Sequence, residues 1–291
     1  MATVQEMREK FIKTLEDKGR SASTVIAYGK DIEQLSEFLK GRGISDPTSI
    51  KLEDLTSFTQ GLEKKEYTPK SVSRKINSIR TFFKDMLARK VITDNIAEKL
   101  SHPKFETKPP RVLSEMEYRA LRDVARADTR LYSIVEILLQ TGIRIGELTR
   151  LTTEDIKTTS DGKVKYINIC EFGSHSSRKV PLNASALNAI NEYLKIRPKS
   201  DTNNIFVTKT GNPLLVRNIR TSIQRAFEKA GIKDAKVNDL RNTFIAHHLA
   251  NGVSLVTVSK LVGHKRLSTT EKYLNLLDKD DNGTHQKLSA L

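Results

Sequence analysis

Three short segments in the second half of the chain carry residues that could act on a phosphodiester. "TGIRIGELTRL" holds Arg144, "VNDLRNTFIAHHLANG" holds Arg241, and "LVGHKRLSTTEKYLNLL" holds His264 and, nine residues later, Tyr273. Two guanidinium groups can grip the non-bridging oxygens of a phosphate and stabilise the charge of its transition state. A histidine can donate a hydrogen bond or move a proton, and a tyrosine can attack as a nucleophile. Together they predict a phosphoryl-transfer site that needs no metal.

Neighbouring residues support this interpretation, although each one alone has an ordinary structural explanation. Glu147 lies one helical turn after Arg144, where its carboxylate could brace the guanidinium. Arg144 could equally be a surface ion-pair partner, His264 a core or capping histidine, and Tyr273 a half-buried aromatic. The conjunction favours catalysis. No cluster of acidic residues at metal-ligand spacing lies near the arginines, so we expect neither a metal nor another cofactor.

The charge balance points to nucleic acid as the partner. The chain of 291 residues has a formal net charge of +15 and a pI of about 9.7, the electrostatic profile of a nucleic-acid binder. A merely basic soluble protein is the alternative. Cys170 is the single cysteine, which excludes an internal disulfide and a cysteine-rich zinc site. No apolar run is long enough for a membrane span or a signal peptide, so we expect a cytoplasmic, nucleoid-associated protein without a membrane partner.

A polar segment divides the chain into two regions. Residues 101–114 contain three of the eight prolines, and we expect an exposed linker over 104–113. Before it, over 1–103, apolar residues recur at helical spacing and glycines mark helix ends, which predicts a small all-α bundle. The last long helix of this region carries five cations that could lie against a phosphate backbone: Lys70, Arg74, Lys75, Arg80 and Lys84. The alternative is that these cations only form a solvated basic face.

The region over 114–291 has a mixed pattern. A capping box from Ser114 to Glu117 opens one helix, and Gly142 closes a second, buried one. The runs 163–170 and 178–183 predict two antiparallel strands joined by a polar tip. The remainder is helical by its periodicity. The expected fold is therefore mainly α: an all-α bundle followed by a mixed α/β domain that is mostly helical with a small antiparallel sheet.

The three boxes "TGIRIGEL", "VNDLRNTFIAHHLANG" and "LVGHKRLSTTEKYLNLL", in this order, resemble the signature boxes of the tyrosine recombinase (phage integrase) family, especially its compact Xer-type members. The resemblance covers essentially the whole chain. It implies a core-binding, DNA-binding domain over 1–103 and a catalytic domain over 114–291. It also implies that a segment at about 278–291 could be exchanged between subunits, and a frayed tail is the equal alternative.

The resemblance implies a role for each matched residue. Arg144 and Arg241 correspond to the phosphate-binding arginines, His264 to the histidine of the third box, and Tyr273 to the nucleophile, which forms a 3′-phosphotyrosyl link. Neither ATP nor a divalent ion is then needed. The implied partners are double-stranded DNA recombination sites, two of them held by a homo-tetramer. Basic residues of the third box would place the DNA over the phenol, and Lys265 and Arg266 are the candidates for DNA contact.

Two positions depart from the family pattern. Asn238 stands three residues before Arg241, where the family usually has histidine; an asparagine can bind a phosphate oxygen but cannot titrate. The tip "FGSHSS" lacks the lysine that usually protonates the leaving 5′-oxygen. His175 at the tip, or else Lys165 or Lys179 on the flanking strands, is the candidate acid, and ordinary solvated side chains are the alternative.

Two other classes of protein share parts of this pattern. A DNA-binding regulator that has lost catalysis would keep the basic surface, and the two departures are consistent with it. A type IB topoisomerase would share the chemistry, but the separate N-terminal bundle favours a recombinase. A regulator would bind DNA without a covalent adduct, and a topoisomerase would relax supercoils without a particular site.

Overall fold

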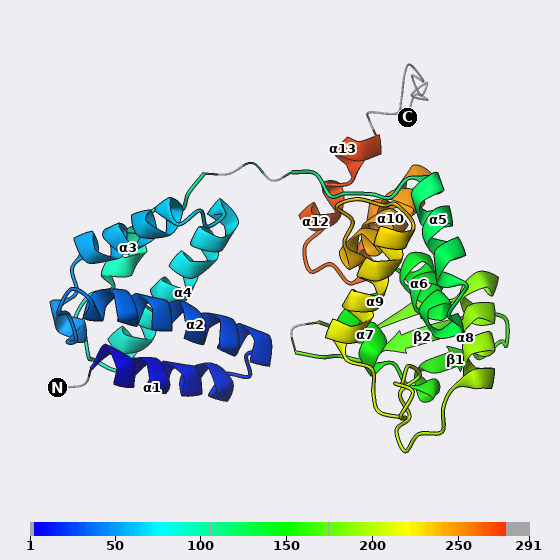
Figure 1. Cartoon of the computed structure of the whole chain (residues 1–291), viewed down its shortest axis with the longest axis horizontal. Coiled ribbons are helices and arrows are strands. Elements are labelled where there is room, and N and C mark those ends of the chain that lie inside the picture. Colours follow the sequence, from blue (N-terminus) through cyan, green and yellow to red (C-terminus); the bar gives the residue numbers. More distant parts are fainter. Residues whose placement is uncertain (1–2, 105, 107, 174, 278–291) are drawn as a thin grey trace. The chain divides into compact units, whose positions relative to one another are not determined.

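The computed structural model describes residues 3–104, 106, 108–173 and 175–277 (Figure 1). It divides into two compact units, Met1–Thr107 and Lys108–Leu291. The division falls inside the segment 104–113 that we expected as a linker. Its last residues already belong to the second unit, since the Arg111 carbonyl accepts a hydrogen bond from Asn242 and the Leu113 amide donates to Thr243. The expected exchange segment, about 278–291, lies outside the described residues.

The first unit is helical throughout its described part. Helix α1 was not among the elements expected, yet Val4, Met7, Phe11 and Leu15 recur along it at intervals of three and four and are all buried. These side chains share one core with apolar residues of the other helices. The elements are α1 (Val4–Asp17), α2 (Ala22–Lys40), η1 (Pro47–Ser49), α3 (Leu52–Lys64), α4 (Pro69–Ala88) and η2 (Ile96–Lys99).

The cations of α4 that could lie against a phosphate backbone are not all exposed. The side chain of Lys75 is 4% exposed and its Nζ lies 2.9 Å from Asp31. Lys75 is therefore an internal partner of a buried carboxylate, which corrects the expectation of a DNA contact. Arg74 pairs with the same carboxylate. Arg80 donates to backbone carbonyls of residues 97, 98 and 100 and so ties η2 to α4.

The second unit is mostly helical with a small sheet, as the sequence indicated. The expected hairpin is present as β2 and β3, and β1 adds a third strand, giving the antiparallel order β1-β2-β3. Ile167 of β2 lies opposite Ile156 and Val180. The elements are α5 (Glu115–Ala125), α6 (Thr129–Thr141), α7 (Ile145–Arg150), η3 (Thr153–Asp155), β1 (Ile156–Thr158), β2 (Lys165–Ile169), β3 (Arg178–Pro181), α8 (Ala184–Ile196), α9 (Val216–Lys229), α10 (Val237–Ala250), α11 (Leu255–Val262), α12 (Ser268–Glu271) and α13 (Leu274–Leu277).

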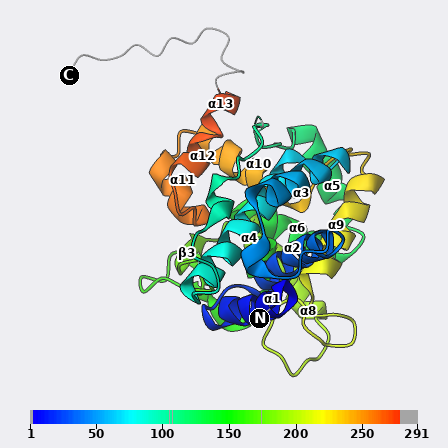
Figure 2. The same ribbon diagram turned by 90° about the vertical axis from the view of Figure 1, so that its left-hand side faces the viewer.

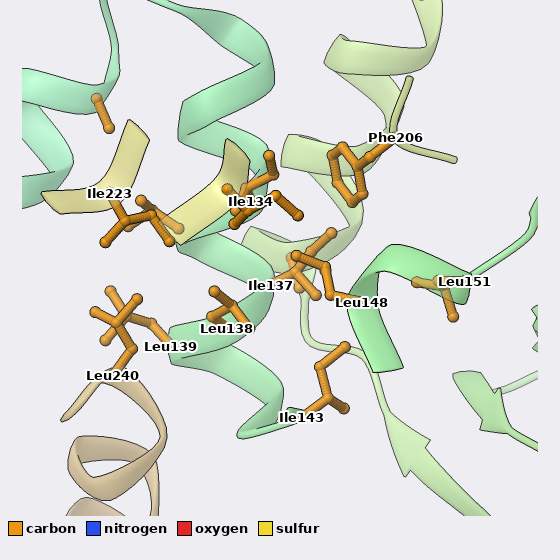
Figure 3. Packing of buried hydrophobic residues seen from close by; sticks show 14 of the residues in the cluster. Ile134, Ile137, Leu138, Leu139, Ile143, Leu148, Leu151, Phe206, Ile223 and Leu240 are labelled. Atoms are coloured by element: carbon orange, nitrogen blue, oxygen red, sulfur yellow. The ribbon is translucent and has the colours of Figure 1, made fainter. Parts of the chain in front are cut away.

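Helix α6 forms the centre of the second unit. Ile134, Ile137 and Leu138 are at most 2% exposed and pack in one cluster with Leu148 of α7 and Leu240 of α10, as Figure 3 shows. Burying such side chains contributes about 1.5–3 kcal/mol each. The cluster fixes the two helices that carry the arginines against a common support. Figure 2 shows α11, α12 and α13 beside α10, and contacts join α10 to α11 and α13 and α11 to α12.

In the part of the chain that the structure describes, no helix is both long enough and apolar enough to cross a membrane.

Candidate active site

The turn between α6 and α7 places the first arginine. Gly142 ends α6 in the left-handed conformation with φ 60°. A Cβ atom on this glycine would overlap the ring of Phe244, so both the backbone angle and the space require glycine. Arg144 follows as the N-cap of α7 and its amide donates to Glu147 Oε2 at 2.8 Å. The guanidinium of Arg144 is thus held at the start of a helix, on a backbone that the turn fixes.

The two arginines expected to bind phosphate are brought together by backbone carbonyls. Arg144 donates to the carbonyls of Val262 at 3.2 Å and Gly263 at 2.7 Å. Arg241, on α10, donates to the carbonyls of Gly142 and Val262, each at 2.6 Å. The Val262 carbonyl therefore accepts from both guanidinium groups. We call Arg144 and Arg241 with these three carbonyls the arginine clamp.

Glu147 braces the clamp and receives a third arginine that the sequence did not reveal. Its carboxylate accepts from Arg144 at 3.0 Å and from both terminal nitrogens of Arg178, at 2.9 and 2.7 Å. Arg178 also donates its Nε–H to the Leu261 carbonyl at 2.7 Å. Burial would raise the pKa of Glu147, but the hydrogen bonds and charge of Arg178, helped by Arg144, lower it to about 2. The carboxylate is ionised at neutral pH.

The clamp carries an excess of positive charge in a partly buried place. Burial, followed by the charges of Arg144 and Arg178 and opposed by Glu147, lowers the pKa of Arg241 to about 9. One carboxylate faces three guanidinium groups. Because the like charges repel one another, an incoming anion relieves the repulsion. The arrangement therefore favours binding of a phosphate group.

His264 lies next to this positive charge and is neutral. It follows Gly263, which ends α11 at φ 67°, and its Nδ1 lies 2.7 Å from the hydroxyl of the fully buried Thr270. Burial, and then the charges of Arg241 and Arg144, lower the pKa of His264 to about 4. At neutral pH the imidazole is therefore uncharged, so it can accept a proton or donate as a neutral group.

Tyr273 lies between α12 and α13, with 6% of its surface exposed. Its hydroxyl donates a 2.8 Å hydrogen bond to Oδ1 of Asn242 on α10. Burial raises the pKa of the phenol; Arg241 lowers it and Asp239 raises it. Asn242 is not among the site residues that the sequence predicts.

A pocket of roughly 600 Å³ opens beside the clamp. Arg144, Glu147, Arg241 and Asn238 line it, while Tyr273 is not among its lining residues. Asn238 thus stands in the pocket where the family pattern usually has histidine. In its outer part the pocket is lined by three more basic residues, Arg150, Arg220 and Lys236. Gln224 and the exposed aromatic Phe172 complete this part of the lining.

Of the three candidates for a proton donor at the hairpin, one lines this pocket. His175 does so, and burial, followed by the charge of Arg144, lowers its pKa. Lys165 lies opposite Thr158 on the sheet, and the Lys179 ammonium lies 5.0 Å from the ring centre of Tyr166. Neither lysine lines the pocket.

The other basic residues of the third box are exposed, as a DNA contact requires. Lys265 and Arg266 follow His264 in the turn before α12, and the charge of Lys265 acts on His175. Over the described residues, no group of three or more histidine, cysteine or acidic side chains is arranged to hold a metal ion.

Comparison with known families gives two matches. Residues 111–280 match the model described as "Phage integrase family", and residues 9–90 match "Phage integrase, N-terminal SAM-like domain". The first match alone covers more than half of the chain, including all three boxes.

Two relatives of similar length are both named tyrosine recombinases. The chain is 28% identical to "Tyrosine recombinase XerC" of Bacillus subtilis (strain 168), over 95% of this chain and 93% of the relative. It is 30% identical to "Tyrosine recombinase XerC" of Oceanobacillus iheyensis, over 91% and 90% of the two chains.

Solved structures share the fold. The chain is similar to an XerA recombinase, with 25% identity, a TM-score of 0.54 and coverage of 96% of this chain and 100% of the other. A lambda integrase (75–356) dimer bound to a COC′ core site has 18% identity, a TM-score of 0.75 and coverage of 92% and 97%. A lambda integrase tetramer bound to a Holliday junction has 19% identity, a TM-score of 0.73 and coverage of 91% and 78%.

Proposed function

The chain belongs to the phage integrase family of tyrosine recombinases and is a site-specific DNA recombinase, and on this premise we propose that Tyr273 is its nucleophile and the arginine clamp its phosphate-binding site. The single observation that carries the proposal is the Val262 carbonyl shared by Arg144 and Arg241. It holds two guanidinium groups from separate helices beside one pocket, where both can meet the same phosphate. The regulator alternative gains no support from this geometry.

The proposed step transfers a phosphoryl group. The Tyr273 oxygen attacks the scissile phosphorus, a P–O bond to tyrosine forms, and the P–O5′ bond breaks. The phenolic proton leaves, and the departing 5′-oxygen takes up a proton to become a hydroxyl. Arg144 and Arg241 stabilise the charge on the non-bridging oxygens. A 5′-hydroxyl of a partner strand then reverses the step and rejoins the DNA.

Two histidines have suitable surroundings for the two proton transfers. His264 is uncharged at neutral pH, so it can accept the phenolic proton. His175 lines the pocket, whereas Lys165 and Lys179 do not, and we assign it the transfer to the 5′-oxygen. Asn238 does not titrate, but it lines the pocket, and we assign it the role of a hydrogen-bond donor to the phosphate.

The outer part of the pocket fits a second phosphate of the same strand. Arg150, Arg220 and Lys236 line it, and among the described residues none of them forms an ion pair with a carboxylate. We therefore assign them to a neighbouring phosphate, a contact that positions the strand without reading its sequence.

The assembly and the location are also part of the proposal. We propose that a homo-tetramer acts on two DNA sites in the cytoplasm, in association with the nucleoid. The tetramer is supported by the shared fold with a lambda integrase tetramer bound to a Holliday junction. The net charge of +15 supports binding to DNA.

A covalent adduct tests the proposal. Nicked duplex fragments from the DNA that flanks the gene would be incubated with wild-type protein, Tyr273→Phe and the control Tyr166→Phe, whose ring lies on β2. We expect an adduct that resists denaturation with the wild type and the control, and none with Tyr273→Phe. Specific binding with no adduct from any variant would support the regulator instead. An adduct that survives Tyr273→Phe would refute the assignment of the nucleophile.

A further inference from the structure

The side-chain amide of Asn242 is a buried junction with four hydrogen bonds. Asn242 is 5% exposed, and its nitrogen donates to the Arg111 carbonyl at 3.0 Å and to the Asp239 carboxylate at 3.2 Å. Its oxygen accepts from the Tyr273 hydroxyl at 2.8 Å and from the Asn238 amide at 3.1 Å. Every hydrogen-bonding position of the amide is thus occupied.

These partners fix which way the amide points. The Arg111 carbonyl can only accept, and the Asp239 carboxylate accepts from the backbone amide of Lys236 at 2.8 Å. The amide nitrogen must therefore face these acceptors, and the oxygen must face Tyr273. The phenol is consequently the donor in its hydrogen bond. Reversing the amide would place its nitrogen against the hydroxyl and leave two acceptors facing its oxygen.

We infer that Asn242 is a positioning residue that holds Tyr273 as a protonated phenol, outside the phosphate pocket, until attack begins. This inference rests on the proposed role of Tyr273 as the nucleophile. A phenolate in this position would face an acceptor oxygen at hydrogen-bond distance, which is repulsive. The hydrogen bond must therefore break before the phenolic oxygen can reach phosphorus. Burial of the phenol acts in the same direction.

The residue that binds Tyr273 also binds the chain segment at the start of the second unit. Asn242 binds the carbonyl of Arg111, and the next residue on α10, Thr243, accepts from the Leu113 amide at 2.9 Å. Two successive residues of α10 thus bind the same segment, but only Asn242 also binds Tyr273. Thr243 is for this reason a matched control, because a change there disturbs the same segment without touching the phenol.

The charged groups that act on the phenol are Arg241 and Asp239, both on α10. His264, whose ring binds Thr270 of α12, is neutral above its pKa of about 4 and so keeps the same charge throughout an alkaline titration. Arg241, whose pKa is about 9, changes charge within the same pH range, and it is present in both variants. Neither Asn242→Ala nor Thr243→Val removes a charge. A difference between the two variants in the titration of Tyr273 therefore reports the hydrogen bond.

The experiment combines a titration with a rate. Protein carrying ¹³Cζ-labelled tyrosine would be titrated from pH 8 to 11 by NMR as wild type, Asn242→Ala and Thr243→Val, with Tyr273→Phe to assign the signal. We expect the Tyr273 midpoint to fall in Asn242→Ala and to stay unchanged in Thr243→Val. The first-order rate of adduct formation from bound nicked DNA at pH 7 should rise about 2- to 10-fold in Asn242→Ala alone, the worth of one neutral hydrogen bond.

Either of two results overturns the inference: an unchanged Tyr273 midpoint in Asn242→Ala, or an adduct rate that does not rise. If Asn242→Ala does not fold, the wild type still decides. The ¹⁵N side-chain amide signals of Asn242 should shift between wild type and Tyr273→Phe, and identical signals would refute the contact. The NMR measurements need no DNA, so they separate failure of this inference from failure of wild type to form any adduct.

Discussion

Replacing Glu147 by glutamine tests how much of the site's order depends on one carboxylate. The Glu147 side chain is 4% exposed and lies within 3.0 Å of both Arg144 and Arg178. Its pKa falls from 4.5 to about 2 in the folded chain. At about 1.4 kcal/mol per unit, this corresponds to about 3 kcal/mol of stability, and loss of one partner from a buried ion pair typically costs about 3–5 kcal/mol. Glu147→Gln should therefore destabilise the second unit by about 3 kcal/mol at pH 7.

The same loss should depend on pH in one direction. Because the folded pKa of Glu147 is the lower one, its contribution is fully present above the unfolded value near 4.5 and disappears as the pH falls towards 2. The stability difference between wild type and Glu147→Gln should therefore be constant between pH 6 and 8. Below pH 4.5 the stability difference should shrink, because Glu147 becomes protonated in the wild type and its carboxyl group is then uncharged, like the amide of the variant.

Urea unfolding followed by circular dichroism suits this chain, which has no tryptophan. Glu115→Gln is the matched control, because Glu115 pairs with Arg119 on the surface, where both side chains are more than half exposed. Such a pair contributes about 0–1 kcal/mol. A loss below about 1 kcal/mol for Glu147→Gln at pH 7, or a loss that persists unchanged down to pH 3, would refute the reasoning.

Three further predictions concern titratable side chains in different surroundings. Lys75→Ala should destabilise the first unit by about 1.5–3 kcal/mol in thermal or urea unfolding, because Asp31 loses its buried ammonium partner and keeps only Arg74 and the Ser78 hydroxyl. The exposed Lys70→Ala should leave stability unchanged but weaken DNA binding and reduce its salt slope by about one; the reverse pattern would show that the two roles were misassigned. In the DNA-free protein, the His264 NMR signals should titrate near pH 4. Because the unfolded histidine binds its proton more tightly, stability should fall as the pH drops from about 6.5 towards 4, and a midpoint near 6.5 would contradict the stated surroundings.

Local patterns predicted most of the helices and the residues of the three boxes, because helix periodicity, caps and glycine stops are written within a few residues of one another. Gly142, for example, ends α6 as expected. Contacts between distant segments could not be obtained this way. Arg178 meets Glu147 across 31 positions, and at the start of a strand it gave no sign of burial. Asn242 meets Tyr273 across the same separation, and an asparagine on a helix gave no indication of such a partner.

The prediction that Lys75 of α4 contacts DNA is wrong for a related physical reason. Helical spacing placed Lys75 on the side of α4 that packs against α2, where Asp31 is buried. The pattern identifies which side chains share a face but does not show which neighbouring helix supplies a carboxylate. A buried lysine with a partner and a surface lysine facing DNA are therefore indistinguishable in the sequence.

The acceptors of the arginine clamp are carbonyls of the main chain, and this affects how the protein can change over generations. Any residue at position 262 that fits the buried core and keeps the helix end supplies the same carbonyl to Arg144 and Arg241. Such substitutions therefore leave the positions of the two guanidinium groups, and with them the proposed contact to DNA, unchanged. The vulnerable positions are instead Gly142 and Gly263, whose left-handed backbones aim two of the carbonyls. Whether this site tolerates a substitution should therefore depend more on whether the backbone conformation is kept than on the chemistry of the new side chain.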